Sequence, residues 1–142
     1  MSVTDASADA LRRGLAPAPA DATLVGVVRD PDPGFRRLVD TNVPELAPPA
    51  PVLADAREVA AEFRMAGMCA EGAHNAAWDD VGVLERYRDR LDDDPAARTA
   101  LDGLRERVRA GESLVIVDTV GPNRRSHRVV LAERLACTER GR

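Results

Sequence analysis

The chain has 142 residues, a length that predicts one domain burying roughly 70% of the surface of the unfolded chain. Its formal net charge of −4 argues against general nucleic-acid binding, because that affinity depends on neutralising phosphates. No apolar run is long enough to cross a bilayer, and the first residues contain no apolar segment typical of a secretory signal. We therefore expect a cytoplasmic protein without a membrane partner.

The composition also bears on the protein's environment and on metal chemistry. All 20 basic residues are arginine, and Asp outnumbers Glu, which fits a halophilic cytosol; a GC-rich genome explains the same composition. Cys69 and Cys137 predict free thiols rather than a disulfide framework. Cys69, Glu71 and His74 fall short of a zinc signature, so we predict neither a metal site nor a cofactor. The sequence does not determine the oligomeric state.

From the N-terminus, the sequence predicts a tail and then a strand. Residues 1–20 include a segment rich in Pro and Ala and predict a flexible tail, in which residues 10–15 could form a helical turn. A single domain is expected over residues 21–137, followed by a short C-terminal tail over 138–142. Residues 23–28, TLVGVV, form an apolar run that predicts a buried strand.

Proline shapes the next segments. Residues 29–34 contain two prolines and a glycine, which predicts a turn. We expect a second extended segment at 35–39. Residues 44–51, PELAPPAP, predict a rigid linker that neither a helix nor a central strand tolerates.

Two helices separated by a loop are predicted next. The first ends at Gly67, and its apolar face consists of Ala56, Val59, Ala60 and Phe63. Residues 68–75 are expected to form the loop. The second helix spans residues 78–91, with the apolar residues Trp78, Val81, Leu84 and Leu91.

A third helix has signals at both ends. Asp94 is a capping residue, Pro95 occupies the first helical position, and Gly111 follows the helix. Its apolar stripe consists of Leu101, Leu104 and Val108.

The last part of the chain predicts a strand, a loop and a helix. Residues 114–117, LVIV, are apolar on both faces, which is typical of a central parallel strand covered by helices. A loop follows at 118–123, and Ser126 caps a final helix that carries Val130, Leu131 and Leu135. This order of elements predicts an α/β protein, a single small layered domain with a short, mainly parallel sheet flanked by helices.

Polar side chains follow both predicted strands. Arg29 comes after the first strand, and Asp118 and residues 123–128 come after the second. Ligands bind outside the carboxyl ends of parallel strands, and a helix N-terminus with arginine side chains favours an anion. We therefore predict a site for a small anionic ligand, phosphate-like or nucleotide-like, formed by Arg29, Asn123, Arg125, Ser126, His127 and Arg128.

Two other functions stay open. A hydrolase-type enzyme would use His127 as acid and base, Arg128 to stabilise negative charge, and Asp118 as a further catalytic candidate. A protein-interaction domain would have no small-molecule site, its arginines would be dispersed and no cleft would form. In a purely structural interpretation, the arginines are solvated or paired with Asp118 or Glu133, and Ser126 acts only as a cap.

The fold distinguishes these alternatives by what it brings together. A pocket is favoured if Arg29, His74, Asp118, His127 and Arg128 converge. We expect Arg57 to lie at a distance from such a pocket.

Several short segments occur in an order that resembles a known family. They are LAPP at 46–49, AWDD at 77–80, RYRDRL at 86–91, GESLVIVDT at 111–119 and RSHRVVL at 125–131. The chain resembles domain of unknown function family 488, which includes YeaO-like proteins, over residues 23–136. The resemblance implies a compact α/β domain with a parallel sheet, and it implies no particular activity.

One branch of that family has a characteristic pattern after its last strand. A cysteine ends the strand, a glutamate lies nearby, and Cys-His-Arg opens the final helix. The corresponding positions here are Asp118, Val120, Ser126, His127 and Arg128. Only His127 and Arg128 match, so the resemblance carries no thiol chemistry over to this chain.

Overall fold

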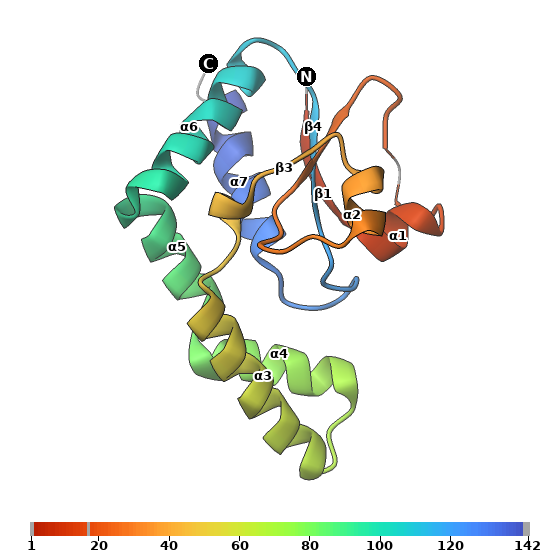
Figure 1. Ribbon diagram of the computed structural model, residues 1–142, viewed down its shortest axis with the longest axis vertical. Coiled ribbons are helices and arrows are strands. Elements are labelled where there is room, and N and C mark those ends of the chain that lie inside the picture. The colour runs from red at the N-terminus through yellow and green to blue at the C-terminus, as the bar shows by residue number, and fades with distance from the viewer. Residues whose placement is uncertain (1, 17, 141–142) are drawn as a thin grey trace.

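The computed structural model describes residues 2–16 and 18–140 and shows an α/β fold built on a parallel sheet (Figure 1). The strands of this part of the chain are β1 (Val3–Ser7), β2 (Thr23–Gly26), β3 (Thr41–Asn42) and β4 (Leu114–Asp118). All strand pairs are parallel, and the order across the sheet is β1-β4-β2-β3. The predicted fold class is thereby confirmed.

Helices cover both faces of the sheet. The short helices α1 (Ala8–Arg12) and α2 (Pro33–Leu38) lie on one face, and α5 (Val83–Asp93), α6 (Pro95–Arg109) and α7 (His127–Arg140) lie on the other (Figure 1). Right-handed crossovers explain this division. The chain moves in one direction across the sheet from β1 to β3 and then returns to insert β4, so the two sets of connections fall on opposite faces.

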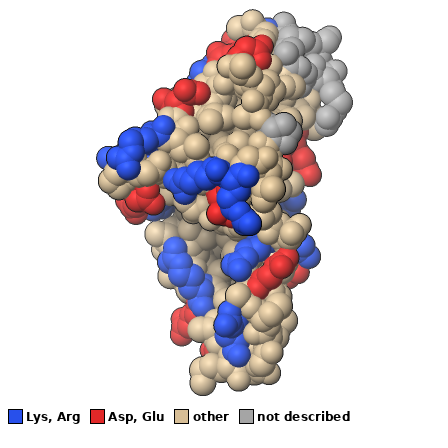
Figure 2. Space-filling view, turned by 90° about the vertical axis from the view of Figure 1, so that its right-hand side faces the viewer, with Lys and Arg blue, Asp and Glu red and all other residues tan. Residues whose placement is uncertain are grey.

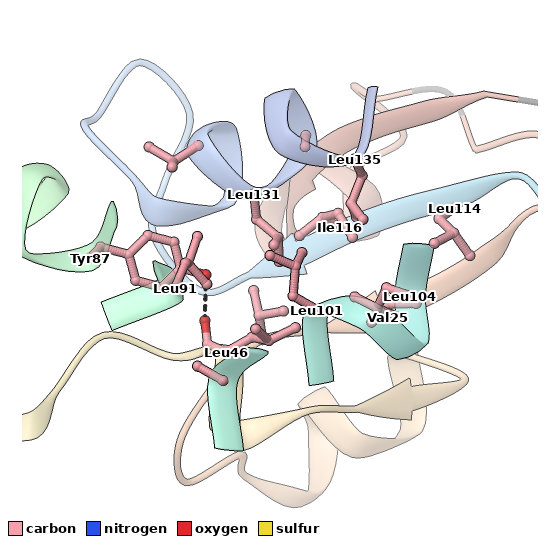
Figure 3. Close-up of a cluster of buried hydrophobic side chains, with 14 of the residues drawn as sticks. Val25, Leu46, Tyr87, Leu91, Leu101, Leu104, Leu114, Ile116, Leu131 and Leu135 are labelled. Atoms are coloured by element: carbon pink, nitrogen blue, oxygen red, sulfur yellow. Dashed lines mark hydrogen bonds between the residues drawn. The ribbon is translucent and has the colours of Figure 1, made fainter. Parts of the chain in front are cut away.

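Strand β4 is the centre of the core. All five of its residues are buried between β1 and β2, which confirms the predicted central strand. Leu114 and Ile116 pack with α6 and α7, and Val115 and Val117 pack with Phe35 of α2. Figure 3 shows the larger cluster, in which leucines of α6 and α7 surround Ile116.

The structure corrects the expected N-terminal tail. Residues within 1–20 form β1 and α1, and β1 pairs with β4 from Val3 to Ser7. Ser7 caps α1 by accepting a hydrogen bond from the Ala10 amide at 3.1 Å. Sequence patterning missed β1 because its residues do not alternate clearly, whereas β4 needs a hydrogen-bonding partner on this edge. Residues 1 and 17 lie outside the described residues.

The proline-rich segments are helical at two places where we expected none. Residues 35–39 belong largely to α2, whose cap Asp32 accepts a hydrogen bond from the Phe35 amide at 2.8 Å. The predicted linker at 44–51 contains a 3₁₀ helix, η1 (Pro44–Leu46), and the start of α3 (Ala50–Met65). Both corrections have one reason: proline is tolerated in a first helical turn, where its missing N–H has no partner to lose.

The segment 68–91 also differs from expectation. The predicted loop at 68–75 is mostly the beginning of α4 (Ala70–Val81), capped by the Cys69 sulfur. The predicted single helix over 78–91 is divided between α4 and α5 by Gly82, whose φ is 73°. Helices α3 and α4 pack on each other and project from the body of the molecule below the sheet (Figure 1).

The two remaining helices agree with the sequence patterns. In α6, Asp94 accepts a hydrogen bond from the Ala97 amide at 3.1 Å, and the predicted stripe is buried. The predicted apolar residues of α7 are buried as well: Val130, Leu131 and Leu135. Helix α7 continues to Arg140, so the tail expected from residue 138 is helical at its start, and residues 141–142 lie outside the described residues. Within the described ranges, no helix is both long enough and apolar enough to span a membrane.

Candidate functional site

A pocket of about 460 Å³ lies at the carboxyl ends of β2 and β4. Residues at and just after the ends of the two strands form one side, and residues 47–48, α3 and α4 supply the other. Figure 2 shows a hollow between the body of the molecule and the α3–α4 projection, with arginine side chains on its margins. The pocket is lined by Val27, Val28, Arg29, Asp30, Ala47, Pro48, Ala50, Leu53, Arg57, His74, Trp78, Asp118, Thr119, Val120 and His127.

Asp118, the last residue of β4, lies at the base of the pocket and is buried. Its carboxylate accepts hydrogen bonds from the Ser126 hydroxyl, from Arg128 Nη1 at 2.6 Å and from the Val120 amide at 3.1 Å. A buried carboxylate needs a cation and hydrogen bonds, and these three donors supply both.

Arg128 is the cation that offsets this charge. Its Nε lies 3.1 Å from Asp5 Oδ1, and its Nη1 also donates to the Val120 carbonyl at 2.8 Å. The side chain is 7% exposed and does not line the pocket. Arg128 therefore joins β1, β4 and α7 in a buried ion-pair network, which we call the Arg128 network: Asp5, Asp118 and Arg128.

His127 borders the pocket and is neutral at ordinary pH. Its Nε2 lies 2.9 Å from the Val27 carbonyl oxygen, which only accepts, so Nε2 carries the hydrogen. Its Nδ1 is buried without a hydrogen-bond partner among the described residues, 3.6 Å from Asp118 Oδ2. Burial lowers the pKa of His127, and the nearby Asp118 carboxylate opposes this effect without reversing it.

We expect the free energy of unfolding to decrease as the pH falls below about 6.5, the pKa of an unperturbed histidine. Because the pKa of His127 is lowered in the folded protein, the unfolded chain binds a proton that the folded protein does not, so acid favours unfolding. The stabilisation is complete above the unfolded pKa and is lost toward the lower folded pKa. Urea denaturation at a series of pH values measures this slope.

Two variants separate the contributions of the histidines to this slope. The pKa of His74 is also lowered, mainly by burial, so both residues contribute in the same direction. His127→Asn should flatten the pH dependence more than His74→Asn. If the free energy of unfolding of His127→Asn depends on pH as steeply as that of the unmodified protein, the assignment of this pH dependence to His127 is wrong.

Helix α4 holds the loop that follows β4. The Asn75 side chain accepts a hydrogen bond from the Arg125 amide at 2.7 Å and donates one to the Asn123 carbonyl at 3.3 Å. Arg125 also pairs with Asp79 at 3.1 Å, and Asn123 adopts a left-handed backbone with φ 65°. Asn123 and Arg125 are thus engaged with α4 rather than with the pocket.

His74 connects this loop to the pocket wall. Its Nε2 lies 2.9 Å from the Arg125 carbonyl oxygen, and its ring stacks on Trp78 with centroids 4.9 Å apart. Both rings line the pocket. The same helix therefore positions the loop and supplies aromatic surface to the cavity.

Arg29 and Arg57 bring positive charge to the pocket. Arg29 Nη2 donates to the Pro48 carbonyl at 3.0 Å, while its Nε is buried without a hydrogen-bond partner in the described part of the chain. Arg57, on α3, is exposed. Within residues 2–16 and 18–140, no carboxylate forms an ion pair with either arginine, although Asp30 also lines the pocket.

The structure thus brings together part of the predicted set. Arg29, Asp118 and His127 line the pocket with His74, whereas the remaining predicted ligand-binding residues do not: Asn123, Arg125, Ser126 and Arg128. The expectation that Arg57 lies at a distance is wrong, because the α3–α4 projection places it in the pocket lining. Its sequence neighbourhood offered no signal, since the approach of α3 to the strand ends is a tertiary feature.

In the described part of the chain, His127 is not placed to act as a base for the Ser126 hydroxyl. The Ser126 hydroxyl donates to Asp118 rather than to His127, and His127 Nε2 is occupied by Val27. Among the described residues, no group of three or more His, Cys, Asp or Glu side chains is arranged to hold a metal ion.

The fold and the pocket define an α/β domain with a ligand-sized cavity at the carboxyl edge of a parallel sheet. Comparisons of the chain with protein families, with curated proteins and with solved structures found no match.

Proposed function

We propose that this protein binds a small anionic ligand in the pocket, with Arg29 as the principal contact. The observation that carries the proposal is the state of the Arg29 guanidinium, which lies in the pocket wall, half-buried, without a carboxylate partner among the described residues. Charged groups removed from water are normally paired. An anion in the pocket would supply the missing partner.

Three further features support this proposal. The Pro48 carbonyl holds Arg29 in place, so less side-chain freedom is lost on binding. Arg57 adds a second positive charge from α3. The pocket lies outside the carboxyl ends of parallel strands, where ligands of α/β proteins usually bind.

The Arg128 network acts on this site indirectly. Asp118 lies at the base of the pocket, and an uncompensated carboxylate there would repel an anion. The guanidinium of Arg128, 2.6 Å from Asp118, offsets that charge. We therefore assign Arg128 a structural role beside the pocket and the binding role to Arg29 and Arg57.

Titration with inorganic phosphate and with sulfate tests the proposal. Binding is followed by calorimetry or by amide chemical shifts. Arg29→Gln is expected to weaken phosphate binding about tenfold or more, because a charge-assisted hydrogen bond contributes roughly 1.5–3 kcal/mol. A circular dichroism melt confirms that the variant is folded.

Arg88→Gln is the matched control. Arg88 is an exposed arginine of α5, outside the pocket lining. Its replacement removes the same charge and should leave the phosphate affinity nearly unchanged. Equal weakening by the two substitutions, or no binding at millimolar concentration of phosphate, sulfate or any organic anion tested, would refute the proposal.

We also propose that the chain is a relative of domain of unknown function family 488. The support is the ordered set of short segments and the matching His127 and Arg128 at the start of α7. The parallel α/β sheet agrees with the fold that the resemblance implies. A structure of a family member tests this relation through the position of the equivalent histidine and arginine.

A further inference from the structure

The pocket has an apolar wall beside its arginines. Pro48, Ala50 and Leu53 form this wall on the side of α3, and Trp78 continues it on α4. Leu53 and Val120 are half-buried and pack against a small cluster that contains Val52, Ala56, Trp78 and Val83. The lining therefore combines cationic groups with an extended apolar surface.

The size of the cavity bears on what fills it. About 460 Å³ lies within the range of roughly 300–1,000 Å³ typical of pockets for organic ligands. An inorganic anion would occupy a small part of this volume and leave the apolar wall in contact with water. Removing such a wall from water is favourable. The cavity thus has room for an apolar group attached to the anion, and burying that group against the wall would strengthen binding.

We propose that the ligand is an organic anion whose single anionic group contacts Arg29 and Arg57 and whose apolar body, about the size of one aromatic ring, packs against Leu53 and Trp78. This inference rests on the proposed function and names the chemical class of its ligand. His74 contributes to the same surface, since its ring stacks on Trp78 at 4.9 Å. Burial lowers the pKa of His74, which keeps that ring uncharged near neutral pH.

The test compares ligands that share an anionic group and differ in the apolar body. Phenyl phosphate is compared with inorganic phosphate, and benzoate with acetate, by calorimetry on the full chain near neutral pH. We expect each aromatic ligand to bind at least tenfold more tightly than its counterpart. The chain has a single tryptophan, Trp78, which lines the pocket, so its fluorescence should change with phenyl phosphate more than with phosphate.

A substitution in the apolar wall tests whether this wall causes the preference for phenyl phosphate. Leu53→Ser should remove most of the preference for phenyl phosphate and leave the affinity for inorganic phosphate nearly unchanged. Leu15→Ser is the matched control, because Leu15 is 66% exposed and lies outside the pocket lining. If Leu53→Ser fails to fold, the Trp78 fluorescence of the unmodified protein still tests the position of the ring.

The outcomes separate this inference from the proposed function. If phosphate and phenyl phosphate bind with equal affinity and Arg29→Gln abolishes the binding of both, the inference that the ligand has an apolar body is wrong. The proposed anion site is then still supported. A preference for phenyl phosphate that persists in Leu53→Ser, with no change in Trp78 fluorescence, would overturn the position of the apolar body. No binding of any of the four anions would overturn both.

Discussion

Arg128→Met is expected to lower the free energy of unfolding by about 3–5 kcal/mol, because it leaves a buried carboxylate without its cation. Asp118 is 1% exposed, and Arg128 Nη1 is its cationic partner at 2.6 Å. Methionine keeps most of the length of the side chain and removes its charge and donors. The loss should appear as a lower denaturation midpoint in urea with an unchanged slope.

Two further variants define the source of this loss. Arg125→Met breaks the exposed ion pair with Asp79, which should contribute only about 0.2–1 kcal/mol. Combining Arg128→Met with Asp118→Asn removes the uncompensated charge and should recover part of the stability. If Arg128→Met is no more destabilising than Arg125→Met, the Arg128 network is not a significant source of stability.

Leu101→Ala is expected to lower the free energy of unfolding by about 2–5 kcal/mol, the range for a leucine truncated in a packed core. Leu101 is 2% exposed and lies in the cluster with Ile116 and Leu131 (Figure 3). The truncation removes buried apolar surface and leaves a cavity between α6 and the sheet. Urea denaturation followed by circular dichroism measures the change.

The control for this truncation is an exposed leucine. Leu15→Ala removes the same atoms at a position that is 66% exposed, and its effect should stay within about 0.5 kcal/mol. A loss below about 0.5 kcal/mol in Leu101→Ala would contradict the packing of α6 on the sheet.

Several elements were predictable because their signals are local. The apolar run at 114–117 occurs in β4, and Asp94 with Pro95 begins α6 at the predicted place. A cap, a first-turn proline and a stripe of leucines act within one or two helical turns. The rule that ligands bind at the carboxyl ends of parallel strands also predicts Arg29, Asp118 and His127, which line the pocket.

Other features follow only from the tertiary structure. Strand β1 is ordered by pairing with β4, more than 100 residues away in the chain, and its own sequence has a weak pattern. Arg128 donates a hydrogen bond to Asp5, which lies 123 residues away in the chain. An arginine that the sequence predicted to bind the ligand therefore belongs to a buried ion-pair network. Arg57 lines the pocket because α3 and α4 project beside the strand ends (Figure 1).

The sequence by itself therefore determined the α/β class, the central strand and the edge of the sheet where the pocket lies. Only the tertiary structure decided which arginines beside that pocket have no carboxylate partner among the described residues. The physical reason is the distance along the chain over which each kind of interaction acts. Helix caps and apolar periodicity are interactions between near neighbours, whereas the pairing of a charge depends on which distant segments the folded chain brings within about 4 Å of it.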